Sequence, residues 1–442
     1  MLSILFLPLI FISLFNLVNG LKKQKHALGL HCLNITYLYI YGLGGFYSVF
    51  NYPENLWLYK NFYREDFYFI LTALLISLAY VFSYKSYFFF SKINLTKNKL
   101  ININLLKKAS NISLVLCIVF IYVYSSQYGG LYNALESAAA IRSGYGELED
   151  GAKLTFVKYL MPIGVFPFLL YGYNIANKPT ISNIIMWVFS FVSVFLAFLL
   201  MSGRTRIVIY ILAMIIIFIY SKKNINFNMS QIIKFSPFLG LAIFFIVYGK
   251  IIFSSLGDIL QGNNIHSVIE SSDKKESFLD SMFGYFCHRT YATEAALMNF
   301  RDTNYLYWFK DNFMSIFYLI PERLTGVVKP DSISPYNTEV LTGVYEGTIP
   351  PGILAYGVYS LWIPGIFIMA ILYSSIFGIM DSYFRKNFSE KYLLIIVLPI
   401  IVVWGLYGTT GDFKIIVNSF SYILVFILLI LLLKILSWVS KK

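Results

Sequence analysis

The sequence predicts an all-α protein, a polytopic membrane helix bundle with about 11 transmembrane helices. Of its 442 residues, 58% are hydrophobic and only 13% are charged, whereas soluble domains contain about 25% charged residues. The mean hydropathy is +0.68. This composition excludes an ordinary soluble globular protein, a disordered chain and a secreted disulfide scaffold.

Eleven apolar segments approach the length of about 20 residues that a helix needs to cross the hydrocarbon layer. Each is expected to be helical, because lipid cannot satisfy backbone N–H and C=O groups. We expect these segments to form a single membrane domain over residues 1–442. They are 3–20, 27–50, 67–84, 109–128, 154–174, 182–202, 205–220, 235–253, 352–380, 391–408 and 413–437.

The distribution of lysine predicts the sidedness of the bundle. No basic residue precedes the first apolar segment, and Lys22, Lys23 and Lys25 follow it. The positive-inside rule therefore predicts an outside N-terminus and, after eleven spans, an inside C-terminus. With this alternation the inside loops hold 19 Lys and Arg against 2 acids. The net charge of +13 is thus explained by topology, and we expect no nucleic-acid partner.

Arginine shows the opposite bias, because seven of the eight arginines fall in outer loops. The planar guanidinium group binds phosphate or carboxylate through two parallel hydrogen bonds and keeps its charge. An outward cluster of arginines therefore favours an anionic ligand. The alternative is that some of them pair with nearby acids such as Glu65 or Asp302.

Two outer loops are long enough to contain a site, the first at 129–153 and a large one at 254–351. A connection as long as the second is usually functional. In the first loop, Arg142 follows a helix-favouring stretch and is a candidate anion ligand, although a solvated charged loop explains it equally well. No Walker A motif is present, so ATP-driven pumping is not supported.

A turn with almost no loop, Ser202–Arg206, joins two apolar segments and brings Arg204 and Arg206 to the outer end of the bundle. Ionisable residues at that depth point to a functional site, and a helix N-terminus further favours an anion. The alternative is that these side chains extend to lipid phosphates.

In the large loop, His288, Arg289 and Glu294 lie near the start of an expected helix, where they would provide acid–base and phosphate-binding groups. The later run Thr342–Gly357 is rich in Gly, Pro and Thr and opens a span interrupted at Pro364-Gly365. This pattern is typical of a broken or re-entrant element, with Glu346 at its mouth. Asp412 and Lys414 are expected to form a further charge pair at the outer surface.

These pieces together resemble the Wzy-type oligosaccharide repeat unit polymerases of bacteria, which make O-antigen and capsule. The resemblance covers roughly residues 110–415 and is clearest at Ser202–Arg206, His288–Phe300, Ile320–Pro330 and Thr342–Gly357. One departure is that the acidic residue expected shortly after Pro350-Pro351 is absent. Glu346 precedes this proline pair instead.

The resemblance implies a metal-independent membrane glycosyltransferase without a cofactor, located in the bacterial inner membrane with a periplasmic active face. It would join repeat units carried on undecaprenyl diphosphate, with the membrane, the lipid-linked oligosaccharide and a chain-length regulator as partners. The two outer loops would be periplasmic. The expected catalytic bases are Glu346, His288 and Glu294, and the expected substrate-binding residues are Arg142, Arg204, Arg206, Arg289, Arg323 and Lys329.

Three other functions are compatible with parts of the pattern. An O-antigen ligase shares the architecture and the lipid-linked donor, although the motif order after the large loop favours a polymerase. A flippase for lipid-linked oligosaccharides is expected to have internal repeats and short loops on both sides. A sugar-binding or scaffold membrane protein without catalysis is the remaining alternative.

Overall fold

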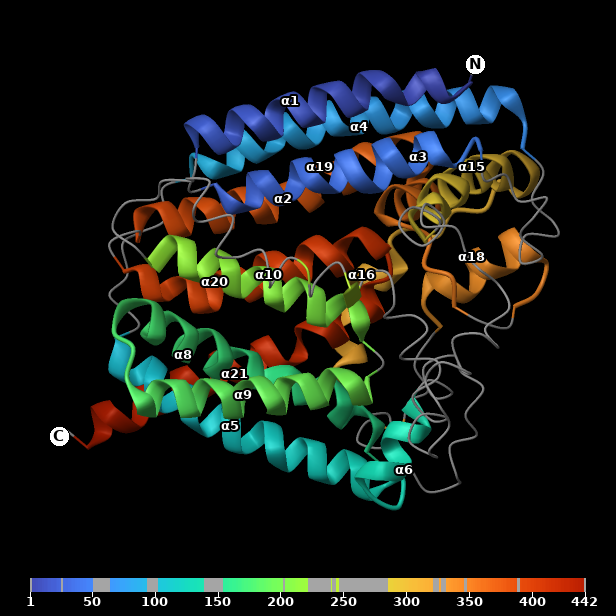
Figure 1. Ribbon diagram of the computed structural model, residues 1–442. Helices are drawn as coiled ribbons and strands as arrows, with labels where there is room; N and C mark the ends of the chain where they lie inside the picture. Colours follow the sequence, from blue (N-terminus) through green and yellow to red (C-terminus); the bar gives the residue numbers. More distant parts are fainter. Residues whose placement is uncertain are drawn as a thin grey trace. The chain divides into compact units, whose positions relative to one another are not determined.

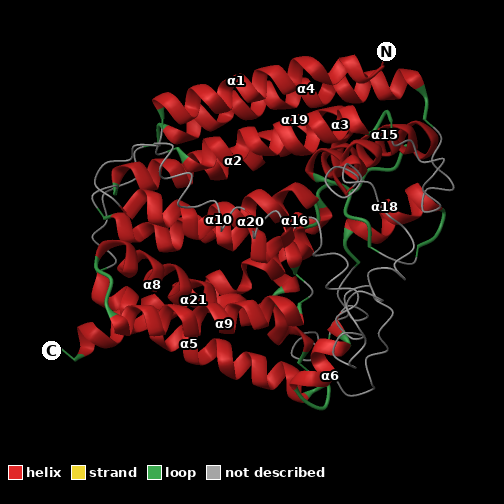
Figure 2. Ribbon diagram, viewed as in Figure 1, coloured by secondary structure: helices red, strands yellow, loops and turns green. Residues whose placement is uncertain are grey.

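All regular secondary structure among the described residues is helical (Figure 2). The computed structural model describes residues 2–24, 27–50, 64–93, 102–138, 154–201, 203–221, 240, 244–245, 285–320, 326, 331–345, 348–387 and 390–440. This confirms the all-α class predicted from the composition.

Eight helices among the described residues are long and apolar enough to cross a membrane, which makes the chain a multi-pass membrane protein. The predicted span at 205–220 forms a shorter apolar helix, and the one at 27–50 forms three short elements in succession. The predicted span at 235–253 lies almost wholly outside the described residues. The eight helices are Leu2–Lys23, Asp66–Ser91, Ile103–Ser126, Phe156–Asn177, Ile181–Leu200, Ile353–Lys386, Lys391–Thr410 and Phe413–Val439.

The chain divides into two units, of which unit 1 comprises Met1–Lys97, Leu279–Phe388 and Ile400–Ser419. Its helices are α1 (Leu7–Lys23), α2 (Leu28–Thr36), α3 (Gly44–Tyr47), α4 (Asp66–Ser91), α15 (Tyr285–Thr303), α16 (Lys310–Tyr318), α18 (Ile333–Thr342) and α19 (Ile353–Lys386). The long helices α4 and α19 pack along each other, and the Ser83 hydroxyl donates to the Ala370 carbonyl over 3.0 Å. Figure 1 shows α15 and α18 at the end of these helices where α4 begins.

A buried carboxylate from α19 holds the start of α2. Asp381 accepts hydrogen bonds from the backbone N–H groups of Gly29 at 2.8 Å and Leu30 at 3.0 Å, and from the Tyr87 hydroxyl at 2.6 Å. The first N–H groups of a helix have no partner within the helix. Asp381 therefore caps α2 from a segment more than three hundred residues away along the chain.

Unit 2 comprises Asn98–Phe278, Ser389–Pro399 and Phe420–Lys442. Its helices include α5 (Ile103–Ser126), α6 (Leu131–Glu136), α8 (Val165–Asn177), α9 (Ile181–Leu200), α10 (Arg204–Ser221) and the later part of α21 (Phe413–Val439). Aromatic packing holds α8 to α21, because the rings of Phe166 and Phe426 stack with centroids 3.6 Å apart. The Tyr210 and Tyr422 hydroxyls hydrogen-bond each other and connect α10 to α21.

Helix α19 is broken near its start, where Leu361 and Trp362 leave the helical conformation and Trp362 takes a φ of 53°. Gly357 and Gly365 are in direct backbone contact, so that a Cβ on either would overlap the other residue. Eight residues of straight helix would separate them by about 12 Å. The chain therefore folds back, and Ile353–Ser360 forms a half-helix against the start of the main span. The interruption expected at Pro364-Gly365 is present, a few residues earlier.

Candidate functional site

The candidate site lies in unit 1, where helices α15, α16 and α18 gather around the broken start of α19. None of these three helices belongs to the eight apolar ones. Helix α15 packs against α3, α4, α18 and α19. Its polar side chains face this packed surface, since Arg289 is 3% exposed and Glu294 is 0% exposed. A buried charge needs a partner, so the contacts of these two residues define the site.

Arg289 lies against the start of the half-helix. Its Nη1 donates to the Pro350 carbonyl over 2.7 Å, and a Cβ at Gly352 would lie 2.9 Å from the Arg289 Cδ. Gly352 has a φ of +92°, so both its backbone conformation and this close contact require glycine. The first turn of a helix also has a partial positive charge. The guanidinium group and the helix start together form a positive region suited to an anionic group.

Glu294 forms an ion pair with Arg64, with 3.4 Å between its Oε2 and the Arg64 Nε. Arg64 also donates to the Ser48 carbonyl over 3.3 Å and lies over the Phe69 ring, 4.2 Å from its centroid. Burial raises the pKa of Glu294 to about 7, although the nearby Arg64 lowers it in part. This carboxyl group is therefore near its titration point at neutral pH, but it faces the interior.

His288 precedes Arg289 on α15 and is partly buried. Burial and the neighbouring Arg289 lower the pKa of this histidine to about 4. The imidazole is therefore neutral at pH 7 and keeps one ring nitrogen able to accept a proton. Of His288, Arg289 and Glu294, His288 has the most exposed side chain.

The segment after α15 satisfies the carbonyl groups that the break in α19 releases. The backbone N–H of Tyr307 donates to the Tyr359 carbonyl over 2.7 Å, and that of Trp308 donates to the Ser360 carbonyl over 3.2 Å. These are the last two residues of the half-helix, whose carbonyls have no partner within it. Tyr307 and Trp308 thus stabilise the end of the half-helix, as Arg289 stabilises its beginning.

Two buried aspartates hold α16 and α18 in place. Asp311 accepts from the Tyr307 hydroxyl over 2.6 Å and from the backbone N–H of Ile333 over 2.9 Å. Burial raises the pKa of Asp311 to about 6. Asp412 accepts from the Ser332 hydroxyl over 2.7 Å and also from the Ser334 hydroxyl.

The expectation that Asp412 lies at the outer surface in a charge pair is wrong, because its side chain is buried among these hydroxyl groups. Neither Asp311 nor Asp412 was predicted as part of the site. A sequence signal exists for Asp412, which directly precedes α21 and is a residue type typical of helix caps, as is its partner Ser332 before α18.

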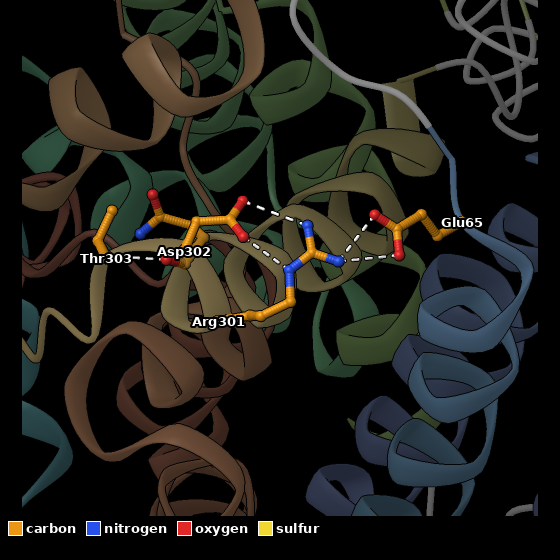
Figure 3. A network of polar contacts seen from close by, with 5 residues as sticks. Glu65, Arg301, Asp302 and Thr303 are labelled. Carbon is orange, nitrogen blue, oxygen red and sulfur yellow. Dashed lines mark hydrogen bonds and ion pairs between the residues drawn. The ribbon is translucent and has the colours of Figure 1, made fainter.

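Arg301, at the end of α15, pairs with the acids Glu65 and Asp302, which is the alternative to ligand binding given above for the outer arginines (Figure 3). Its Nη1 lies 2.9 Å from each carboxylate oxygen of Glu65, and its Nε lies 2.6 Å from the Asp302 Oδ1. Arg301 lowers the pKa of Asp302 below its usual range. This network is exposed and joins the end of α15 to the start of α4.

In unit 2, the Gly-Arg turn leads directly into helix α10, which begins at Arg204. The Arg206 Nη1 lies 2.8 Å from the Met201 sulfur. The next residue, Ile207, is among those that line a small apolar cavity between α8, α9 and α10. Its lining is Phe168, Phe191, Val194, Phe195, Phe198, Ile207, Tyr210 and Ile211.

The predicted site residues are thus only partly described. His288, Arg289 and Glu294 lie together on α15 in unit 1, and Arg206 lies in unit 2. Arg142, Arg323, Lys329 and Glu346 fall outside the described residues, as does the Arg204 side chain. Within the described part of the chain, no group of three or more His, Cys, Asp or Glu side chains is arranged to hold a metal ion.

Comparisons with known proteins add no family assignment. The chain matches no protein-family model, no curated protein and no solved structure.

Proposed function

We propose that this protein is a membrane glycosyltransferase that polymerises oligosaccharide repeat units carried on undecaprenyl diphosphate into O-antigen or capsular polysaccharide. In this proposal the N-terminus and the α15–α18 segment face the periplasm, and the C-terminus faces the cytoplasm. The protein belongs to the bacterial inner membrane. Its substrate is an anionic lipid with a sugar head, so it needs both basic and apolar surfaces.

The observation that supports this proposal most is the contact between Arg289 and the start of α19. Arg289 comes from one of the segments that resemble Wzy-type polymerases, and Pro350 and Gly352 come from another. These two segments, 61 residues apart at Arg289 and Pro350, meet through a hydrogen bond of 2.7 Å. A buried arginine at a helix start is a suitable group for binding a diphosphate.

The proposed reaction assigns a role to each type of residue. The acceptor hydroxyl oxygen attacks the anomeric carbon of the donor sugar, and the bond from that carbon to the diphosphate oxygen breaks. The diphosphate keeps the bonding electron pair, and Arg289 stabilises its developing charge. The hydroxyl proton passes to a general base, for which Glu346, His288 and Glu294 are the candidates. Protonation of that base completes the balance.

The pKa favours Glu294 as the base, whereas accessibility favours His288. Glu294 has a pKa of about 7, close to the ideal for a base at neutral pH, but its side chain is fully buried beside Arg64. His288 is more accessible but, with a pKa of about 4, is a weaker base. Glu346 lies outside the described residues, and its role rests on its position in the sequence.

In unit 2, Arg206 is a second candidate for binding the lipid diphosphate, because it belongs to the segment Ser202–Arg206 that contributes to the resemblance.

The proposal is tested by the glycan profile of host cells in which the gene is deleted and complemented with variants. A polymerase deletion should leave core carrying a single repeat unit, and the wild-type gene should restore the ladder. Arg289→Ala should fail to restore it at normal protein level. Arg301→Ala is the matched control, because this arginine lies on the same helix in an exposed ion pair, and it should restore the ladder.

Other profiles would identify the alternatives. Accumulation of long lipid-linked chains with an unmodified core indicates a ligase. Repeat units trapped on the cytoplasmic face indicate a flippase. Either result contradicts the proposal, and a full ladder from Arg289→Ala contradicts the role given to Arg289.

A further inference from the structure

Helix α16 has an inverted distribution of polar and apolar side chains. Phe313 and Phe317 are 76% and 51% exposed, and Ile320, just after the helix, is also exposed. These three residues share one face at spacings of four and three. The opposite face buries Asp311 and Tyr318, which hydrogen-bond each other. A helix in water would bury the aromatic face and expose the acid.

Contacts to two membrane-spanning helices determine the depth of α16 relative to the membrane. Its Asn312 side chain accepts a hydrogen bond of 2.9 Å from the hydroxyl of Tyr356, which belongs to the half-helix at the start of α19. The ring of Tyr318 lies 5.8 Å from the ammonium group of Lys414, the second residue of α21. Both contacts are to the first residues of apolar helices. Helix α16 is therefore level with the ends of these two spans.

The length of α19 agrees with this level. Beyond its break the helix continues from about residue 363 to Lys386, which at 1.5 Å per residue covers about 36 Å. That is enough to cross a hydrocarbon layer of about 30 Å without the half-helix. The half-helix, and α16 beside it, therefore lie at the boundary between the hydrocarbon and the headgroups.

We propose that α16 is an interfacial helix that lies on the bilayer surface with Phe313 and Phe317 inserted among the lipids. Two tryptophan side chains near the break are also exposed, Trp308 at 64% and Trp362 at 41%. Tryptophan is enriched at this depth because its ring is apolar and its N–H remains hydrogen-bonded. The inferred ligand is thus the lipid surface itself.

This placement explains why α16 exposes apolar side chains and buries an acidic one. Lipid replaces water on the exposed face, so apolar side chains there are favourable. The acid is buried on the protein side, where the Tyr307 hydroxyl and the Ile333 N–H provide its hydrogen bonds. The inference depends on the membrane character of the chain and not on the proposed reaction.

The test measures the accessibility of spin labels in the full chain, reconstituted in vesicles of phosphatidylethanolamine and phosphatidylglycerol. Cys32, Cys117 and Cys287 are replaced by serine, and a label is attached at Phe313→Cys or Phe317→Cys. Collisions with oxygen, which concentrates in lipid, and with a nickel chelate, which stays in water, are compared. Thr303→Cys is the matched control, because Thr303 is exposed at the end of α15, beside the ion pairs of Arg301.

The expected result is high oxygen and low nickel accessibility at positions 313 and 317, with the reverse at position 303. Nickel accessibility at 313 and 317 equal to that at 303 would mean a water-facing surface and would overturn the inference. Low accessibility to both probes would mean that protein covers this face, which overturns it equally.

A second measurement avoids the cysteine replacements. Phe313→Trp adds an indole to the otherwise native chain, and vesicles containing lipids brominated near the carbonyl end quench tryptophans at that depth. The variant should lose a larger share of its fluorescence than the wild-type protein does. Added emission that bromine leaves unquenched, while a soluble quencher removes it, would contradict the inference.

Discussion

Replacing Glu294 by glutamine should remove a specific pH dependence from the stability of this protein. The Glu294 carboxyl is 0% exposed and lies 3.4 Å from Arg64. Burial raises its pKa from 4.5 to about 7, despite the attraction of that arginine. The folded protein therefore holds this proton more tightly than the unfolded chain does, and glutamine imitates the protonated carboxyl in shape and charge.

The sign and size of the effect follow from proton linkage. Below pH 4.5 the carboxyl is protonated in both the folded and the unfolded chain, so it adds no pH dependence. Between pH 4.5 and 7 the unfolded chain releases this proton while the folded chain retains it, so the free energy of unfolding falls as pH rises. A pKa difference of this size corresponds to about 3 kcal/mol, all of it lost above pH 7.

The assay is equilibrium unfolding in mixed detergent micelles, with an increasing fraction of sodium dodecyl sulfate, at several pH values from 4.5 to 8. The stability of wild type relative to Glu294→Gln should fall by about 3 kcal/mol over this range. Arg64→Met should extend the fall to higher pH and increase its size, because the attraction that lowers the folded-state pKa of Glu294 is removed while the unfolded chain is unchanged.

Comparison at each pH cancels the contribution of Asp311, which both proteins keep. Glu339→Gln, on the exposed surface of α18, is the control and should run parallel to wild type. Parallel curves for wild type and Glu294→Gln would refute the reasoning. So would a relative stability of wild type that increases with pH.

Three further substitutions and one control test contacts within unit 1. Gly365→Ala places a methyl group into the Gly357 backbone and should cost about 3 kcal/mol in the same unfolding assay, while Gly240→Ala, whose added Cβ meets no atom within 4 Å, should be neutral. Asp412→Ala leaves two buried serine hydroxyls without their acceptor and should cost about 3 kcal/mol. Arg301→Ala should leave the melting temperature unchanged, because its ion pairs are exposed to solvent.

The fold was predictable from the sequence because the bilayer imposes one simple requirement on each span. An apolar run of about 20 residues must be helical in lipid, and eight of the predicted runs appear as long apolar helices. The break in α19 was indicated by Pro364, yet the residues that leave the helix are Leu361 and Trp362. Proline removes the hydrogen bond to the residue four positions earlier, so the distortion falls before it.

The site was predictable only where local sequence determines it. A helix was expected to begin just after His288 and Arg289 and to contain Glu294; the helix that is present, α15, begins earlier, at Tyr285, and contains all three residues. Their partners were not predictable, because Arg64 lies 230 residues from Glu294 along the chain and only the packing of α15 on α4 brings them together. The contact of Arg289 with Pro350 likewise depends on the position of the half-helix.

The ion pair of Glu294 and the hydrogen bond of Arg289 depend on the same rotation of α15. Arg289 and Glu294 are five residues apart on one helix, so the ion pair with Arg64 fixes the rotation of α15 that directs Arg289 to Pro350. A buried ion pair contributes little net stability, but it specifies one arrangement among several. Under the proposed function, we therefore expect Arg64→Met to reduce polymer formation in cells even at pH values where the protein stays folded. Glu294→Gln, which keeps a hydrogen-bonding group at the same place, should reduce it less if Glu294 positions α15, whereas a complete loss would identify Glu294 as the general base.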